Sequence, residues 1–156
     1  MATVNGSLIL ARALRRHGVD TMFFLMGGPM VPAESYCISE GMRAIDVRHE
    51  QAAAMMAHAW ARVTGRVGVC MACSGPGTAN LVTGIANAWA DCAPVMAFGG
   101  SAPLVFNGKG IFQECDQLAL MRPITKWADR CHDPRQLPDM IAHGMRQAMT
   151  GRRGPV

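Results

Sequence analysis

Long apolar runs and a signal-like start are both missing from this sequence. No stretch reaches the roughly 18 consecutive apolar residues that a membrane-spanning helix needs, because Asn80, Asn87, Asp91 and several glycines interrupt every candidate. Residues 1–5 lack the basic-then-apolar pattern of a secretory signal peptide. We therefore expect a soluble, cytoplasmic protein with no membrane partner.

The sequence also has little that would hold a metal or a disulfide framework. Its six cysteines come without a secretory context, and cytosolic thiols stay reduced. Cys70 and Cys73 form a C-x-x-C pair, but residues three apart on a strand point to opposite faces and cannot easily share a metal or a bridge. No His-x-x-x-His pattern or paired Cys/His cluster occurs. We expect buried, inert thiols and no metal ligands here.

A further absence is a basic surface with interleaved aromatic residues. The formal net charge is +4, but the arginines are divided among separate predicted helices and the end of the chain. Arg12, Arg15 and Arg16 fall on the outer face of the first predicted helix, and Arg152 and Arg153 lie close to Val156. This pattern is typical of solvated helix faces and argues against a nucleic-acid partner.

Half of the 156 residues are apolar, which suits one folded domain with a sizeable core. Short β-prone runs alternate with helical segments, a pattern that predicts an α/β fold with right-handed crossovers and a parallel sheet. We expect strands at residues 21–25, 43–47, 67–72, 95–98 and 125–130. Helices are expected at residues 5–17, 32–40, 50–65, 78–91 and 137–150, and an irregular loop at 101–115.

The stretch 47–80 organises the chain. Glu50 opens an Ala-rich helix, a strand follows, and Ser74-Gly75-Pro76-Gly77 forms a tight turn into the next helix. Parallel sheets bind ligands at the carboxyl ends of their strands, where such turns lie. Taken alone, Glu50 reads as an ordinary helix-start carboxylate, and Gly27-Gly28 after the first strand reads as an ordinary turn.

Five motifs occur together in one order, and their combination resembles a known family. They are Gly27-Gly28, Arg48-His49-Glu50-Gln51, Ser74-Gly75-Pro76-Gly77-Thr78-Ala79-Asn80, Phe112-Gln113-Glu114 and Pro123-Ile124-Thr125-Lys126-Trp127. The chain resembles the pyrimidine-binding domain of thiamine diphosphate enzymes such as acetolactate synthase, benzaldehyde lyase and 2-hydroxyacyl-CoA lyase. The resemblance implies that residues 1–156 form a three-layer α/β/α domain with a mostly parallel central sheet, the thiamine diphosphate-binding fold.

The resemblance also implies a role for particular residues. Glu50 would bond the far pyrimidine nitrogen of thiamine diphosphate and favour the imino tautomer, whose nitrogen takes the proton from C2 of the thiazolium ring. Gln113 would face the substrate and Phe112 would form a wall beside it, so Glu50 and Gln113 are the expected catalytic residues. The expected cofactor-binding residues are Met26, Gly27, Gly28, Glu50, Cys73, Pro76, Gly77 and Asn80.

Some positions depart from the family pattern. Met26 stands where acetolactate synthases usually have Pro, Leu25 where they have Tyr, and Cys73 where Thr is common. Pro29 replaces a small residue. The Pro-Ile-Thr-Lys-Trp stretch is closer to benzaldehyde lyase, whereas Phe112-Gln113-Glu114 leans toward acetolactate synthase. The resemblance therefore implies an enzyme that decarboxylates 2-oxo acids or makes and breaks acyloin-type C–C bonds, and leaves its substrate open.

The Gly-Asp-Gly segment that holds the diphosphate and Mg²⁺ in the family does not occur. We expect those ligands on a diphosphate-binding domain of the same or a partner chain, within a homo-oligomer (dimer or tetramer). Gly154-Pro155-Val156 matches the start of the family's last strand, so we expect the domain to be truncated there, without the central and diphosphate-binding domains. FAD is possible but not indicated. Two alternatives stay open, the small subunit of a split 2-oxo acid decarboxylase and a non-catalytic α/β scaffold that binds a nucleotide or a protein.

Overall fold

The computed structural model describes residues 4–156, so the first three residues of the segment 1–5 lie outside the described part. Its centre is a parallel four-stranded sheet in the order β2-β1-β3-β4. The strands are β1 (Thr21–Phe24), β2 (Arg43–Asp46), β3 (Gly68–Ala72) and β4 (Val95–Gly99). Phe24 of β1 lies opposite Asp46 of β2 on one side and Met71 of β3 on the other. The predicted α/β class and the parallel sheet are confirmed.

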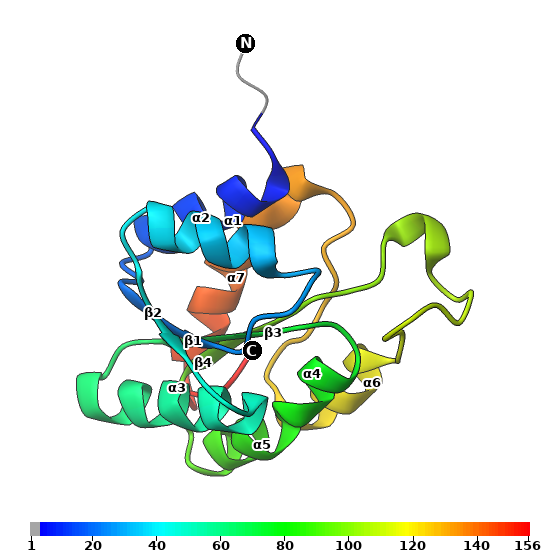
Figure 1. The fold of residues 1–156 in the computed structure, drawn as a ribbon. Helices are drawn as coiled ribbons and strands as arrows, with labels where there is room; N and C mark the ends of the chain where they lie inside the picture. The colour runs from blue at the N-terminus through cyan, green and yellow to red at the C-terminus, as the bar shows by residue number, and fades with distance from the viewer. Residues whose placement is uncertain (1–3) are drawn as a thin grey trace.

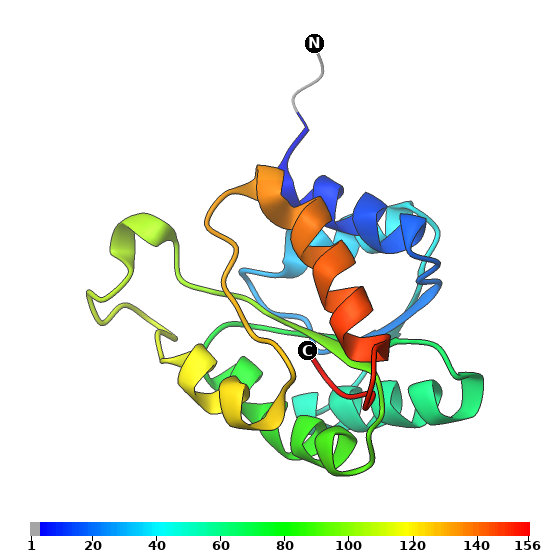
Figure 2. The ribbon, with the colours of Figure 1, turned by 180° about the vertical axis from the view of Figure 1, so that it is seen from behind.

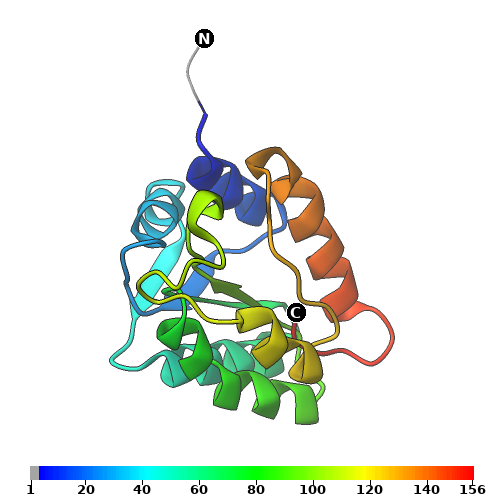
Figure 3. The same cartoon turned by 90° about the vertical axis from the view of Figure 1, so that its right-hand side faces the viewer.

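Helices cover both faces of the sheet (Figures 1 and 2). One layer consists of α1 (Gly6–Arg16), α2 (Val31–Ser39) and α7 (Leu137–Met149). The other contains α3 (Glu50–Thr64), α5 (Val82–Ala90) and the short helices α4 (Pro76–Asn80) and α6 (Gln117–Met121). Figure 3, turned by 90°, shows the two layers with the sheet between them. The structure is therefore a three-layer α/β/α domain.

Alternation along the strands divides the core in two. Met22 and Phe24 of β1 join the cluster beneath α1, α2 and α7, whereas Phe23 joins the cluster beneath α3 and α5. In β3, Met71 lies in the first cluster and Cys70 in the second. Successive strand side chains point to opposite faces, so a strand buried on both sides reads as one continuous apolar run.

Local signals explain where the helices begin and end. Asn5 caps α1, because its Oδ1 accepts a hydrogen bond from the backbone N–H of Leu8 at 2.9 Å. His49 caps α3 in the same way through Nδ1, which accepts from the N–H of Gln51. Gly65 ends α3 with φ 71°, a left-handed conformation that glycine adopts without a Cβ clash. On α1 the predicted inward side chains, Leu10, Ala11 and Leu14, are buried.

The predicted strand at residues 125–130 is wrong. This segment is irregular and follows a 3₁₀ turn, η2 (Arg122–Ile124). Thr125 is turned back toward η2, since its hydroxyl donates to the carbonyl of Met121 at 2.8 Å. Lys126 donates its backbone N–H to the carbonyl of Pro155, so the chain bonds the C-terminal tail instead of a strand of the sheet.

The helix predicted at 78–91 is divided into α4 and α5 with a break at Leu81, and it begins earlier, at Pro76. Residues 101–115 form the expected loop, which contains one 3₁₀ turn, η1 (Leu104–Phe106). A further 3₁₀ turn, η3 (Pro134–Gln136), precedes α7. None of the helices in the range 4–156 is long and apolar enough to cross a bilayer.

The C-terminal tail lies alongside β4. Val156 donates its backbone N–H to the carbonyl of Val95 at 2.8 Å, and its carbonyl accepts from the N–H of Ala97 at 2.9 Å. The two bonds flank Met96 as in a parallel ladder. The tail thus extends the hydrogen bonding of the sheet beyond β4.

Candidate active site

All ten residues singled out from the sequence line one cavity of about 490 Å³. The cavity lies where the carboxyl ends of β1 and β3 meet the start of α3, and the loop 101–113 closes it. The sequence therefore identified the residues that the fold brings together here: Met26, Gly27, Gly28, Glu50, Cys73, Pro76, Gly77, Asn80, Phe112 and Gln113. Pro29, one of the departures from the family pattern that the resemblance puts on the cofactor side, also lines the cavity. The remaining lining residues, which sequence reasoning did not assign to a site, are Ser74, Ser101, Ala102, Pro103 and Ile111.

Glu50 is the buried carboxylate of this cavity. Its residue is 8% exposed, and its Oε2 accepts a hydrogen bond from Nδ2 of Asn80 at 2.9 Å. Its Oε1 faces Gly77, where an added Cβ would lie 3.2 Å from that oxygen. The first turn of a helix stabilises negative charge, which suits a carboxylate at the start of α3. The absence of a side chain at Gly77 leaves Oε1 open to the cavity.

The cavity walls are in close contact at two glycines. An added Cβ at Gly27 would lie 2.4 Å from Cβ of Cys73, so the loop after β1 can touch the turn after β3 only without a side chain. At Gly75, whose φ is 57°, an added Cβ would lie 2.0 Å from the carbonyl oxygen of Gln113. The Ser-Gly-Pro-Gly turn therefore packs directly on the loop that carries Gln113.

Gln117 ties three parts of the site together, and sequence reasoning missed it. Its Nε2 donates to the hydroxyl of Thr78 at 2.9 Å and to the carbonyl of Gly100 at 2.8 Å. Its Oε1 accepts from the backbone N–H of Gly75 at 3.2 Å. The one local signal is Asp116, which caps α6 by accepting from the N–H of Ala119 and so places Gln117 at the start of that helix.

The loop that closes the cavity is held by a carboxylate outside it. Glu114 accepts hydrogen bonds from the backbone N–H groups of Gly108, Gly110 and Ile111. These bonds, with that from Gly108 first, hold the pKa of Glu114 below its usual range, because they favour the charged form. Phe112, 88% exposed, projects from the loop at the rim of the cavity.

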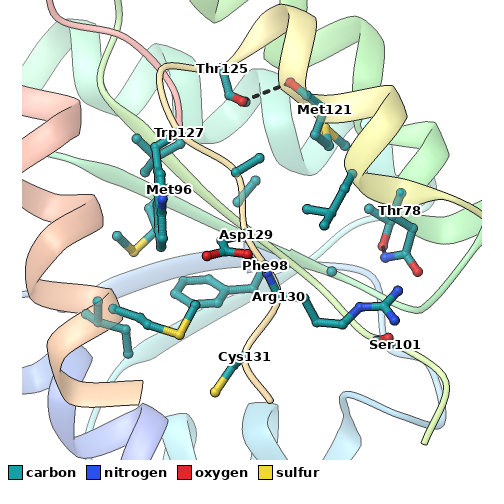
Figure 4. A pocket seen from close by; sticks show the side chains of 18 of the residues that line it. Thr78, Met96, Phe98, Ser101, Met121, Thr125, Trp127, Asp129, Arg130 and Cys131 are labelled. Carbon is teal, nitrogen blue, oxygen red and sulfur yellow. Dashed lines mark hydrogen bonds between the residues drawn. The ribbon is translucent and has the colours of Figure 1, made fainter. Parts of the chain in front are cut away.

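A second cavity of about 270 Å³ lies between β4, α7 and the segment 121–131 (Figure 4). Met96, Phe98 and Trp127 give it a mostly apolar lining, and Val156 forms part of its wall. It contains none of the ten residues identified from the sequence. Among residues 4–156, no cluster of three or more His, Cys, Asp or Glu side chains could hold a metal ion.

The domain has a parallel sheet between two helical layers, with a buried carboxylate and glycine turns at the carboxyl ends of the strands. These features are typical of ligand-binding domains with an open parallel sheet. The family model "Thiamine pyrophosphate enzyme, N-terminal TPP binding domain" matches residues 4–120, and the chain belongs to this family.

Three relatives illustrate the range of the family. The chain is 45% identical, over 99% of its length, to the acetolactate synthase large subunit of Parasynechococcus marenigrum (strain WH8102), and it covers 26% of that protein. It is 41% identical over 98% of its length to the acetolactate synthase isozyme 2 large subunit of Escherichia coli (strain K12), covering 28% of it. It is 37% identical over 99% of its length to 2-hydroxyacyl-CoA lyase 2 of Bos taurus, covering 24%. The chain thus spans about a quarter of the length of these relatives.

The cavity fits one half of the family's cofactor. The open Oε1 of Glu50 and the missing side chain at Gly77 leave room for a flat ring beside the carboxylate. The lining of the same cavity includes neither Lys nor Arg, so it provides no positive charge for a diphosphate. The described residues therefore suit the aminopyrimidine ring and not the charged end of thiamine diphosphate.

Proposed function

We propose that this chain is the pyrimidine-binding domain of a thiamine diphosphate-dependent, acetolactate synthase-like enzyme. The enzyme decarboxylates 2-oxo acids or forms and cleaves acyloin-type C–C bonds. The observation that carries the proposal is the position of Glu50, buried at the start of α3, bonded to Asn80 and open toward a cavity through Oε1. Membership of the family and the relatives' names support the same reaction class.

Each part of the cavity has a task in this proposal. Glu50 holds a proton at the ring nitrogen of the aminopyrimidine through Oε1, while Asn80 fixes Oε2 and so sets the plane of the carboxyl group. Gly27, Gly28 and Gly77 let the backbone approach the ring closely. When bound, thiamine diphosphate supplies the nucleophilic carbon that attacks a carbonyl and stores the electrons released by bond cleavage.

The other half of the site belongs to a second domain in this proposal. A diphosphate-binding domain of the same or a partner chain provides the ligands for Mg²⁺ and the diphosphate. The assembly is a cytoplasmic dimer or tetramer. Gln113 and Phe112, on the loop 101–113, face the substrate where the two domains meet.

The test is cofactor-dependent turnover by the longest natural polypeptide that contains these residues. Decarboxylation of a panel of 2-oxo acids is followed by CO₂ release, with and without thiamine diphosphate and Mg²⁺. We expect turnover that requires the cofactor and is lost in Glu50→Gln. Glu40→Gln, at the end of α2, is the matched control and should keep wild-type activity. Turnover that persists after complete removal of the cofactor would contradict the proposal.

A further inference from the structure

The side-chain carbonyl of Gln113 accepts hydrogen bonds from two residues that follow β3. Its Oε1 accepts one hydrogen bond from Sγ of Cys73 and one from Oγ of Ser74, each at 3.1 Å. Cys73 and Ser74 follow β3 and are buried, whereas Gln113 lies about 40 residues later on the closing loop. A thiol and a hydroxyl can both donate, and of the two ends of an amide only the oxygen accepts. The bonds therefore select one orientation of the Gln113 amide.

The backbone of Gln113 is fixed as well. Its φ is 61°, in the left-handed region that non-glycine residues seldom occupy. Its carbonyl oxygen packs so tightly on Gly75 that no side chain could stand there. Backbone and carbonyl end are thus both held by the turn after β3. The free end is the amide nitrogen, for which the described residues provide no hydrogen-bond acceptor.

We propose that Cys73 and Ser74 are positioning residues that present the two N–H groups of Gln113 to the substrate. A donor fixed in this way recognises a carbonyl or carboxylate oxygen, as in a 2-oxo acid. Such a donor binds a substrate oxygen most strongly where that oxygen carries negative charge, as in a carboxylate. This inference rests on the proposed function and adds to it the residues that orient the substrate-binding amide.

The orientation itself is tested without catalysis, by NMR of the ¹⁵N-labelled chain. The side-chain amide signals of Gln113, assigned by their loss in Gln113→Asn, should be two resolved and slowly exchanging resonances in the wild type. In the Cys73→Ala/Ser74→Ala double variant they should move to the positions of solvent-exposed glutamines. The rest of the spectrum reports whether the variant is folded. Unchanged Gln113 signals in a folded double variant would overturn the inference.

The functional half is tested by steady-state kinetics of the complete enzyme. Removing both donors should raise KM for the 2-oxo acid by about 5- to 30-fold, the effect of one or two net hydrogen bonds, with kcat within about twofold. Cys73→Ser, which keeps a donor, should restore KM when it replaces Cys73→Ala in the Ser74→Ala background. Cys92→Ala, near the amino end of β4, is the matched cysteine control.

Two outcomes separate this inference from the proposed function. If the Gln113 signals change but KM does not, Cys73 and Ser74 order a loop without presenting the Gln113 amide to the substrate, and the inference is wrong. If the wild-type enzyme shows no cofactor-dependent turnover, the proposed function itself fails, whatever the NMR result.

Discussion

Nδ2 of Asn80 lies 2.9 Å from Oε2 of Glu50, across a gap of 30 residues in the sequence. Asn80 is the last residue of α4, the helix that follows the Gly-Pro-Gly turn, and Glu50 is the first residue of α3. The bond joins the two turns that line the cavity and occupies one carboxylate oxygen, so that only Oε1 is left for a ligand. Through Asn80, the segment after β3 therefore fixes the orientation of the Glu50 carboxylate in addition to packing against the neighbouring loops.

Gly75 tests the contact between that turn and the closing loop. Alanine there must adopt φ 57° and would place its Cβ 2.0 Å from the carbonyl oxygen of Gln113. Gly18 is the matched control, since its φ is 77° but nothing lies within 4 Å of an added Cβ. We expect Gly75→Ala to lower the free energy of unfolding by about 1–3 kcal/mol more than Gly18→Ala does, as overpacking costs in other proteins. Urea denaturation measures the free energy of unfolding of both variants. Equal losses of stability would show that the loop carrying Gln113 moves away from the added Cβ at little cost.

Glu34 predicts an unusual dependence of stability on pH. Its residue is 3% exposed, and neither carboxylate oxygen has a hydrogen-bond partner among the described residues. Burial, with a smaller contribution from the charge of Asp46, raises the pKa of Glu34 from 4.5 to about 7. Between pH 4.5 and about 7, Glu34 is therefore protonated in the folded chain and ionised in the unfolded chain. The contribution of Glu34 to the stability of the folded chain is full below pH 4.5 and is lost as the pH rises through about 7.

The measurement is the free energy of unfolding between pH 5 and pH 8. In the wild type it should fall over this interval relative to Glu34→Gln, which carries no titrating group at that position. Glu40→Gln, at the end of the same helix, should keep the wild-type slope. Parallel curves for wild type and Glu34→Gln would show that Glu34 is ionised in the folded chain.

Exposed apolar side chains on the closing loop and on α3 predict association of the isolated chain. Val105 and Phe112 on the closing loop and Met55 on α3 are exposed, and exposed apolar patches promote association. We expect dimers or larger species at micromolar concentration by light scattering. The double substitution Val105→Ser/Phe112→Ser should shift the chain toward monomer, whereas Ile38→Ser, on the exposed part of α2, should not. A monomeric wild-type chain at micromolar concentration would contradict this prediction.

The isolated chain should bind thiamine diphosphate weakly. The cavity holds Glu50 and Asn80 for the ring but no cation for the diphosphate. We expect a Kd no better than millimolar, which corresponds to about 4 kcal/mol, and no dependence on Mg²⁺. Calorimetry on this chain alone is the measurement. Tight binding that requires Mg²⁺ would mean that the charged end of the cofactor has ligands within these 156 residues.

The sequence predicted the fold well because alternating β-prone and helical segments leave few arrangements of a parallel sheet. The strand expected at 125–130 failed for a physical reason. Thr125 and Trp127 favour a strand, but the hydroxyl of Thr125 bonds the carbonyl of Met121, and the backbone N–H of Lys126 bonds the carbonyl of Pro155 instead of a neighbouring strand. Strand propensity reports that a residue fits a pleated surface, and only the tertiary structure supplies that surface.

The ten residues that line the candidate site stand in short motifs at the ends of strands and at the start of α3, which is why the sequence could group them. Gln117 and Ser74 escaped, because their roles depend on hydrogen bonds to residues about 40 positions away. The burial of Glu34 could not be predicted from the sequence either. A glutamate in the first turn of a helix is usually solvated, and the neighbouring residues gave no sign that α2 turns it inward.

The central claim is that the Glu50 carboxyl group shares a proton with the pyrimidine ring of the cofactor, and Glu50→Gln in the complete enzyme tests it most directly. Glutamine keeps the shape and can still bond Asn80, but it has no carboxyl proton to share. NMR of proton exchange at C2 of bound thiamine diphosphate isolates this step from later chemistry, and Glu40→Gln provides the control. We predict that exchange slows by about 10²–10⁴-fold in Glu50→Gln, the usual size of an acid–base effect, with little change in stability. Exchange at the wild-type rate with the cofactor fully bound would contradict the account and leave Glu50 as a structural residue at the start of α3.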